Sequence, residues 1–187
     1  MLYAEHHLTK NIFSRPGKPL KQMKAVVLHY TQNPGQTPLG CRAFFESLKT
    51  QDAADKVPDR SASAHYIIGM TGLIWQVIPE REVAYHCGGI GYTPEAKEYF
   101  GDFCSNPKLS PNHCTIGIEM CHPDTSGLPT PETEKATQEL ARDILARYGL
   151  DPAVALWRHY DVTGKLCPLW YVNHPSDWAR FGAGVNN

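Results

Sequence analysis

The sequence predicts a single α/β domain in which a mixed central β-sheet is flanked by α-helices. Short apolar runs rich in β-branched residues alternate along the chain with segments of helical periodicity, which is the pattern of such a sheet. The length of 187 residues suits one domain with a substantial buried core. The chain has no internal repeats or low-complexity blocks, so a repeat architecture is not expected.

The first part of the chain is predicted to hold a strand, a helix and a loop. Residues 24–30 form an apolar, β-branched run, which favours a buried strand ending near His29. Residues 38–49 have helical periodicity. The apolar face of this helix is formed by Cys41, Phe44, Phe45 and Leu48. Residues 52–60 are charged and are predicted to be a loop.

The middle of the chain is predicted to contain a β-hairpin, a long loop and another strand. Residues 64–70 and 73–78 are separated by Thr71 and Gly72, which is typical of a hairpin with a tight turn. Residues 88–113 hold glycines, prolines and aromatic residues without clear periodicity, which indicates a long functional loop. The alternation in TIGIEM (Thr115–Met120) predicts a strand.

The clearest predicted helix follows. Thr130 is a good N-cap, Pro131 suits the first helical position, and Gly149 ends the periodic stretch. The predicted apolar stripe consists of Ala136, Leu140, Ala141, Ile144, Leu145 and Tyr148. Residues 154–157 are predicted to be a last short strand, and residues 158–170 the loop after it.

The chain divides into three unequal parts. Residues 1–22 are polar and are predicted to be a lead-in packed on the domain, which spans residues 23–180. Residues 181–187 (FGAGVNN) resemble a tail or the start of a linker, so a separate C-terminal domain is expected beyond this chain.

Composition excludes several classes of protein. The formal charge of −1 lacks the strongly basic footprint of a nucleic-acid-binding protein, so no nucleic-acid partner is expected. No apolar run reaches the roughly 20 residues of a membrane-spanning helix. The N-terminal segment has no apolar signal core, so the protein is expected to be made in the cytoplasm without a signal peptide.

The six cysteines are too dispersed for a small disulfide scaffold. They are Cys41, Cys87, Cys104, Cys114, Cys121 and Cys167. Thiols of a protein made in the cytoplasm stay reduced, so most of these residues are predicted to be small buried apolar side chains.

Cys167 is different because His159 lies eight residues before it, in the loop after the last predicted strand. Imidazole and thiolate are zinc ligands, and catalytic zinc has three protein ligands plus an open position. His29, at the end of the first predicted strand, is a candidate third ligand, which places a zinc site at one end of the sheet. On spacing alone, a surface histidine near a buried cysteine explains the pair equally well.

Five segments occur in the order found in one protein family. They are VVLHYT (26–31), SAHYIIG (63–69), VAYHCGG (83–89), TIGIEM (115–120) and RHYDVTGKLCP (158–168). Together they resemble the zinc-dependent N-acetylmuramoyl-L-alanine amidases of the second type, which include phage endolysins, bacterial autolysins and peptidoglycan recognition proteins. The opening segment and the HYDVTGK loop look most like endolysins and autolysins of Bacillus-like bacteria and their phages. The resemblance covers about residues 23–178.

The resemblance implies the roles of five residues. It places the three Zn²⁺ ligands on His29, His159 and Cys167, with cysteine where some members have aspartate. It places the catalytic glutamate on Glu119, and on Lys165 a lysine that acts near the scissile carbonyl.

Two further positions concern the substrate groove. His86 matches a histidine at the rim of the groove in this family, so it is predicted to bind substrate. Where other members have a tyrosine just before the histidine of the second motif, this chain has Ala64. Tyr66 is therefore given no catalytic role.

The implied reaction is hydrolysis of the amide between N-acetylmuramic acid and L-alanine of the stem peptide in bacterial peptidoglycan. Zinc can polarise the carbonyl and acidify water, Glu119 can carry a proton, and Lys165 can stabilise the oxyanion. The enzyme is expected to be monomeric, to act on the cell wall, and to accompany a C-terminal wall-binding domain that is not in this chain.

Two alternative functions fit part of the sequence. Some relatives of this fold bind peptidoglycan without cleaving it, typically after losing a zinc ligand, whereas this chain retains Cys167 together with Glu119 and Lys165. A cysteine peptidase would use Cys167 as nucleophile and His159 as base. Such a thiol benefits from a helix N-terminus, but Cys167 is followed by proline in a predicted loop. The amidase is therefore the favoured function.

Overall fold

The computed structural model describes residues 3–54 and 59–186. In this part of the chain a six-stranded sheet has the order β1-β4-β3-β5-β2-β6. The strands are β1 (Ala4–Glu5), β2 (Ala25–Tyr30), β3 (Tyr66–Ile68), β4 (Ile74–Gln76), β5 (Thr115–Met120) and β6 (Leu156–Arg158). Neighbouring strands are parallel except for β3 and β4, which are antiparallel. The predicted α/β fold with a mixed sheet is confirmed.

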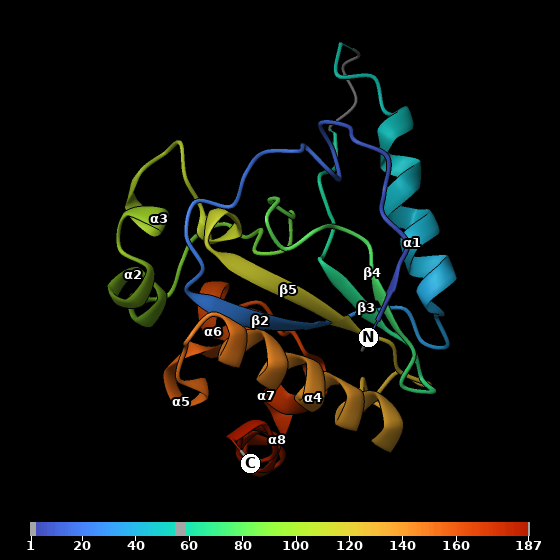
Figure 1. Ribbon diagram of the computed structural model, residues 1–187, viewed down its shortest axis with the longest axis vertical. Coiled ribbons are helices and arrows are strands. Elements are labelled where there is room, and N and C mark those ends of the chain that lie inside the picture. Colours follow the sequence, from blue (N-terminus) through green and yellow to red (C-terminus); the bar gives the residue numbers. More distant parts are fainter. Residues whose placement is uncertain (1–2, 55–58, 187) are drawn as a thin grey trace.

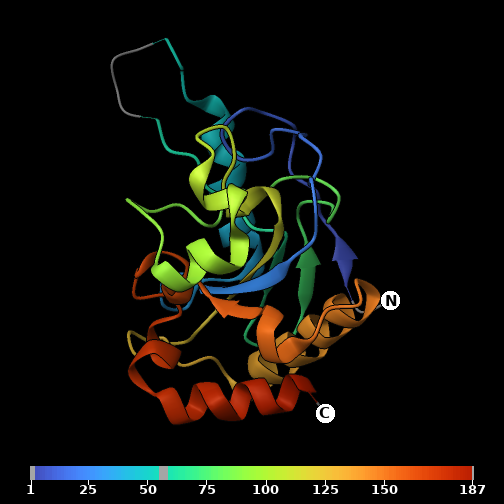
Figure 2. The same ribbon diagram turned by 90° about the vertical axis from the view of Figure 1, so that its left-hand side faces the viewer.

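Helices cover both faces of the sheet (Figures 1 and 2). They are α1 (Pro38–Ser47), α2 (Pro94–Phe100), α3 (Asp102–Ser105), α4 (Pro131–Arg147), α5 (Pro152–Ala155), α6 (His159–Thr163), α7 (Leu169–Asn173) and α8 (Pro175–Asn186), with short 3-10 helices η1 (Leu48–Thr50) and η2 (Pro111–His113). The face below the sheet in Figure 1 packs against α4 and α8, and the other face packs against α1 and α2.

Alternation along the central strands decides which side chains reach each face. On β2, Val26 and Leu28 belong to the core formed with α4 and α8, whereas Val27 packs on the other face with α2. Because side chains alternate along a strand, His29 lies on the same face as Val27. Glu119 on β5 pairs with His29 in the parallel register, so the two polar side chains are neighbours on that face.

The predicted hairpin is confirmed, since β3 and β4 pair in antiparallel register. The Gly72 N–H donates to the Gly69 carbonyl at 2.9 Å across the turn. Gly72 has a φ of +80°, and a Cβ atom there would lie 3.1 Å from the backbone oxygen of Glu132 on α4. Glycine therefore suits both the turn conformation and the close packing at this position.

The predicted strands at 24–30 and Thr115–Met120 and the predicted helix at 38–49 are confirmed as β2, β5 and α1, which continues into η1. Of the charged loop predicted at 52–60, residues 55–58 lie outside the described residues.

The longest helix, α4, begins as predicted. The hydroxyl of Thr130 accepts the Thr133 N–H at 3.1 Å, and Pro131 occupies the first helical position. The buried stripe consists of Ala136, Leu140, Ala141, Ile144 and Leu145. Tyr148 lies beyond the end of α4 and is partly exposed, so it does not belong to the stripe.

The segment 88–113, predicted to be a long loop, contains α2, α3 and η2. The Thr93 hydroxyl caps α2 by accepting the Ala96 N–H at 3.1 Å, and Pro94 is the first helical residue. The same Thr-Pro signal begins α4, so these residues could have revealed α2. The helices here are too short to show a clear periodicity.

The last strand begins two residues later and ends one residue later than predicted. The side chain of Asp151 accepts the Ala153 N–H at 2.9 Å and starts the helical turn α5, so β6 begins only at Leu156. The segment 158–170, predicted to be a loop, contains α6 and the start of α7.

The C-terminal residues differ from the predicted tail at 181–187. Residues 181–186 continue α8, and Phe181 and Val185 are fully buried in the core shared with α4. The ring of Phe181 also packs against Tyr171 at a centroid distance of 5.3 Å. This part of the predicted tail is therefore an integral element of the fold, while Asn187 lies outside the described residues.

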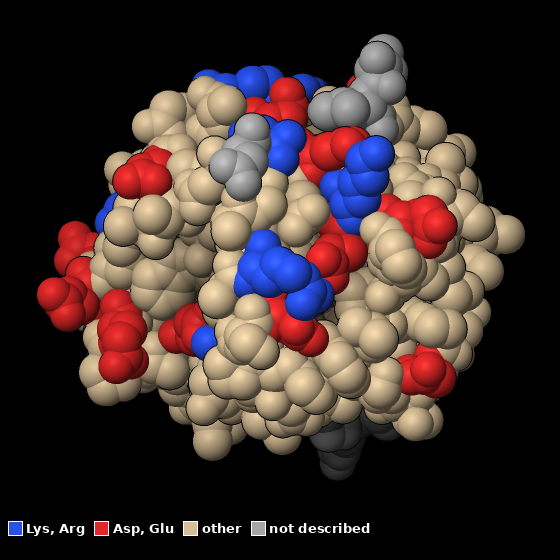
Figure 3. Space-filling view, turned by 90° about the horizontal axis from the view of Figure 1, so that it is seen from below, with Lys and Arg blue, Asp and Glu red and all other residues tan. Residues whose placement is uncertain are grey.

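The described part of the N-terminal segment is tied to the sheet. β1 pairs with β4, and Leu8 is buried in the core that includes Phe45 of α1. No helix in residues 3–54 and 59–186 has both the length and the apolar character needed to cross a bilayer. Basic and acidic side chains lie among one another on the face seen in Figure 3.

We expect Phe181→Ala to lower the free energy of unfolding by about 3–5 kcal/mol, because it removes a fully buried aromatic ring from the core. Denaturant unfolding followed by circular dichroism measures this loss. Leu39→Ala is the matched control, because Leu39 on α1 is 63% exposed. Equal stability of the two variants would mean that the end of α8 contributes nothing to the fold.

Candidate metal centre and active site

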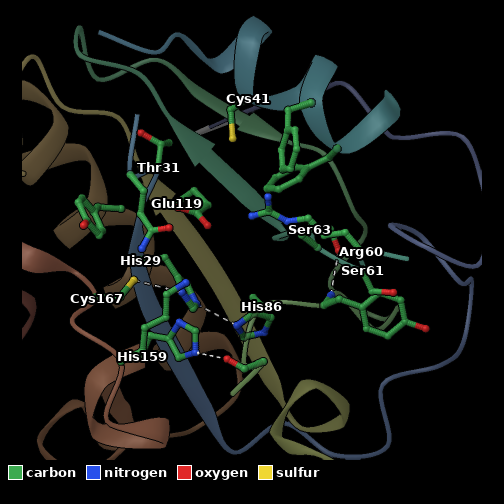
Figure 4. Close-up of a pocket in the computed structure, with 18 residues that line it drawn as sticks. His29, Thr31, Cys41, Arg60, Ser61, Ser63, His86, Glu119, His159 and Cys167 are labelled. Atoms are coloured by element: carbon green, nitrogen blue, oxygen red, sulfur yellow. Dashed lines mark hydrogen bonds between the residues drawn. The ribbon is translucent and has the colours of Figure 1, made fainter. Parts of the chain in front are cut away.

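Three side chains converge at the carboxyl ends of the central strands to form a candidate metal centre (Figure 4). They belong to His29, His159 and Cys167, whose candidate ligand atoms all lie within 4.8 Å of one another. All three residues are buried. Two imidazoles and a thiol are donors that zinc and other transition metals prefer. The structure thus brings the three predicted ligands together in an arrangement that could hold a metal ion.

The parallel sheet brings the two histidines together. β6 runs beside β2 with Arg158 paired to Leu28, so His159 and His29 are the next residues on the two neighbouring segments. His159 begins α6, whose first turn is fixed by Asp161. The carboxylate of Asp161 accepts the Arg158 backbone N–H at 2.9 Å and pairs with the Arg158 guanidinium at 2.6 Å.

The loop between α6 and α7 supplies the third donor and a nearby cation. The Tyr160 N–H donates to the Cys167 carbonyl at 2.8 Å, which ties the returning loop to the start of α6. Lys165 lies in this loop, is exposed and contributes to the wall of the same cavity as Cys167.

Burial sets the protonation of the cluster. Desolvation, followed by the charge of His159, lowers the pKa of His29 well below its ordinary value. Desolvation, followed by the charge of Lys165, lowers the pKa of His159 to about 4. Both imidazoles are therefore neutral at pH 7, which is the form that binds metals.

The thiol of Cys167 is also kept neutral in the absence of a cation. Desolvation, followed by the charge of Glu119, raises the pKa of Cys167 well above its ordinary value. A metal ion bound beside the thiol would reverse this shift and favour the thiolate. A thiol with a raised pKa is a poor nucleophile on its own, which argues against a cysteine peptidase.

The second ring nitrogen of each histidine has a partner outside the cluster. His159 Nε2 donates to the carbonyl of Gly88 at 3.0 Å, and His29 Nε2 lies 3.0 Å from His86 Nδ1. His29 Nδ1 lies 3.7 Å from the sulfur of Cys167. His86 is only 6% exposed and lies against a candidate ligand, but it is also one of the residues that line the cavity of the site, so its role in binding substrate stays a prediction.

Glu119 adds a buried carboxyl group next to the cluster. Its Oε2 atom is shielded from solvent and has no hydrogen-bond partner among the described residues. Desolvation raises the pKa of Glu119 to about 8, and the positive charge of Lys165 opposes that shift. A buried polar atom without a partner is costly unless a water or ligand satisfies it. The site therefore fits a bound cation together with a polar ligand beside Glu119.

These groups open into a cavity of about 200 Å³. Its wall includes Phe44 and Arg60, whose guanidinium lies 5.0 Å from the centroid of the Phe44 ring. Phe44 was predicted on the apolar face of α1 with Cys41 and Phe45; all three line the cavity, but Phe44 is 36% exposed whereas the other two are buried. Arg60 was missed because it belongs to no motif and shows no periodicity.

The fold and the site define an α/β protein with a candidate mononuclear metal centre of hydrolytic type, because three protein donors and a carboxyl group face an open cavity. The protein family described as N-acetylmuramoyl-L-alanine amidase matches residues 19–170. Since this match covers most of the chain, the chain belongs to that family.

Curated relatives agree with the family match. N-acetylmuramoyl-L-alanine amidase CwlL of Bacillus licheniformis is 33% identical over 95% of this chain and 44% of its own length. N-acetylmuramoyl-L-alanine amidase BlyA of Bacillus subtilis is 31% identical over 96% of this chain and 46% of its own length. The chain therefore spans less than half the length of these two relatives.

Solved structures share the fold. The catalytic domain of XlyA is 21% identical with a TM-score of 0.68, and the match covers 98% of each chain. PlyL is 17% identical with a TM-score of 0.71, and the match covers 100% of this chain and 98% of PlyL. At these identities the likeness concerns the fold alone.

We expect Cys167→Ser to lower bound zinc from about one ion per chain to a small fraction, because it replaces a thiolate donor by a weak hydroxyl donor. Elemental analysis after dialysis against limiting zinc measures the occupancy. Cys121→Ser is the matched control, because Cys121 is also buried but is not part of the cluster. Full zinc occupancy in Cys167→Ser would remove this residue from the ligand set.

The raised pKa of Glu119 predicts a pH dependence of stability in the metal-free protein. In the folded state the pKa of Glu119 is about 8, whereas in the unfolded state it is near 4.5. Between these two pH values the carboxyl group ionises in the unfolded state but stays protonated in the folded state, so the free energy of unfolding falls as pH rises toward about 8. In chelator-treated protein, the stability of Glu119→Gln relative to the original chain should therefore increase from pH 5 to pH 8.

Urea midpoints at each pH measure this difference. Glu46→Gln is the control, because its pairing with Lys49 and Thr9 outweighs desolvation and lowers the pKa of Glu46 to about 2. Both its folded and its unfolded pKa lie below pH 5, so its stability difference should be constant over this range. A constant difference for Glu119→Gln as well would contradict the buried, protonated carboxyl group.

Proposed function

We propose that this chain is a zinc-dependent N-acetylmuramoyl-L-alanine amidase. The observation that carries the proposal is the buried carboxyl oxygen of Glu119, which has no hydrogen-bond partner among the described residues. It shares one cavity with a two-histidine, one-cysteine cluster in a member of the amidase family. The bond cleaved would be the amide between the lactyl group of N-acetylmuramic acid and the L-alanine of the stem peptide in bacterial peptidoglycan.

The proposed metal ligands are His29, His159 and Cys167. When bound, zinc supplies Lewis acidity toward the scissile carbonyl and toward water. The neutral state of both imidazoles supports this assignment, because a protonated imidazole could not bind the ion.

Glu119 is proposed to carry the proton of the reaction. Its carboxylate would take a proton from the attacking water and deliver it to the nitrogen of the leaving L-alanine. A pKa raised to about 8 by burial suits this role, because the group can both accept and return a proton near neutral pH. A cation in the neighbouring cluster would lower this pKa and favour the carboxylate before the reaction.

Two cations are proposed to act on the substrate. Lys165 would stabilise the negative charge that develops on the carbonyl oxygen, which its place in the cavity wall and its effect on the pKa of Glu119 both support. Arg60, with its guanidinium over the ring of Phe44, gives the wall a second positive charge that suits an anionic stem peptide.

The proposed place of action is the bacterial cell wall, where peptidoglycan lies. The three candidate ligands and Glu119 all come from one copy of the chain, so a monomer is sufficient for the proposed reaction.

We expect Glu119→Gln to lower turnover of purified cell walls by about 10²–10⁴-fold, because an amide cannot carry the proton of the reaction. Zinc content should remain near that of the original chain, since Glu119 is not one of the three candidate ligands. The rate is measured by release of stem peptides with a free L-alanine amine, identified by mass spectrometry.

Glu139→Gln is the matched control, because Glu139 lies on α4 away from the cavity and should keep full turnover. Near-normal turnover of Glu119→Gln would exclude its catalytic role. If the original chain bound walls but released no such peptides, it would be a binding module. Activity that survives removal of the metal but is lost on alkylation of Cys167 would indicate a cysteine peptidase.

A further inference from the structure

A chain of buried hydrogen bonds leads from the candidate metal centre to the backbone. His29 Nε2 lies 3.0 Å from His86 Nδ1, and His86 Nε2 lies 3.1 Å from the hydroxyl oxygen of Thr115. The Thr115 hydroxyl in turn lies 2.8 Å from the carbonyl oxygen of Pro111. His29, His86 and Thr115 are all buried, so no bulk water competes for these contacts.

The end of this chain fixes the direction of every bond in it. The Pro111 carbonyl can only accept, so the single hydroxyl proton of Thr115 is donated to it. The Thr115 oxygen must then accept the proton on His86 Nε2. An uncharged imidazole carries one N–H, so His86 Nδ1 is left as an acceptor and takes the proton on His29 Nε2. His29 Nδ1 therefore presents a lone pair to the cluster.

The surroundings hold the His86 ring in the position that this chain requires. Asn112 Oδ1 accepts the backbone N–H groups of His86 and Cys87 at 3.0 and 2.7 Å. The ring lies directly against Gly117 of β5, where a Cβ atom would be 2.6 Å from the His86 ring. The sulfur of Cys87 also lies close to this ring, 3.3 Å from His86 Nδ1.

The same short segment orients the other imidazole. Gly88, two residues after His86, accepts the proton on His159 Nε2 through its carbonyl at 3.0 Å. Residues 86–88 therefore fix the ring nitrogens of both candidate histidine ligands, one through a side chain and one through the backbone. Partners of this kind set the tautomer and the ring orientation of metal-binding histidines.

We propose that His86 is a positioning residue for the metal centre. By accepting the proton on His29 Nε2, His86 selects the His29 tautomer whose Nδ1 lone pair faces Cys167. The tautomer of His86 is in turn set by its hydrogen bond to the Thr115 hydroxyl. His86 then acts on the metal through His29. The inference rests on the zinc site of the proposed function, but its test reads metal binding and does not depend on amidase activity.

The test compares Thr115→Val with Thr115→Ser. Valine has nearly the shape of threonine but cannot accept the proton of His86, whereas serine can. We expect Thr115→Val to weaken zinc binding by about 10-fold and His86→Ala by about 10–100-fold, while Thr115→Ser stays close to the original chain. Competition against a chromophoric chelator gives the zinc dissociation constants of the metal-free proteins.

Cobalt substitution gives a second readout. The visible spectrum of bound Co²⁺ reports its ligand geometry, so it should change in Thr115→Val and be restored in Thr115→Ser. Unchanged zinc affinity in Thr115→Val would overturn the proposal. An equal loss in Thr115→Ser would also overturn it, because packing and not the hydroxyl would then be responsible. If His86→Ala does not fold, the two Thr115 variants still decide.

The outcome separates this inference from the proposed function. If the original chain binds zinc but releases no stem peptide, the amidase proposal is refuted. The zinc affinities of the Thr115 variants would still decide the role of His86. If the original chain is an active amidase and Thr115→Val changes neither the zinc affinity nor the cobalt spectrum, only the proposed role of His86 is refuted.

Discussion

The parallel register between β2 and β5 is the constraint on which the site depends. It makes His29 and Glu119 direct neighbours on one face, while Leu28, Ile118 and Met120 beside them belong to the opposite core. A shift of one residue in either strand would send one of the two polar side chains into that core. The apolar packing of Val26, Leu28 and Ile118 against α4 and α8 therefore also fixes the relative position of a metal donor and a carboxyl group.

The second neighbour of β2 completes the arrangement. His159 follows β6 directly and begins α6, and the loop after α6 places Cys167 next to His29 and His159. Each of these polar groups loses hydration when it is buried, and that loss is the largest cause that shifts the pKa of both imidazoles and of the Glu119 carboxyl toward their neutral forms. The folded chain thus keeps a set of uncharged donors together without the mutual repulsion that charged groups would suffer.

Much of this could be predicted from the sequence because the signals are local. The apolar run ending at His29, the alternation up to Glu119 and the Thr130–Pro131 cap each act within a few residues, and the order of five motifs identified the family. The errors and omissions arose where tertiary packing decides. Phe181 reads as part of a Gly-rich tail, yet its ring completes the core. Arg60 enters the cavity wall from a segment without a pattern, and His86 is buried by the absence of a side chain at Gly117.

That absence couples two positions 31 residues apart in the sequence. The His86 ring occupies the space that a side chain on residue 117 would fill, so even alanine there conflicts with the imidazole as it now lies. An engineered variant with a larger residue at position 117 would also need a smaller residue at position 86. Gly117 in the fourth motif and His86 in the third motif therefore have to be considered together when a side chain is introduced at position 117.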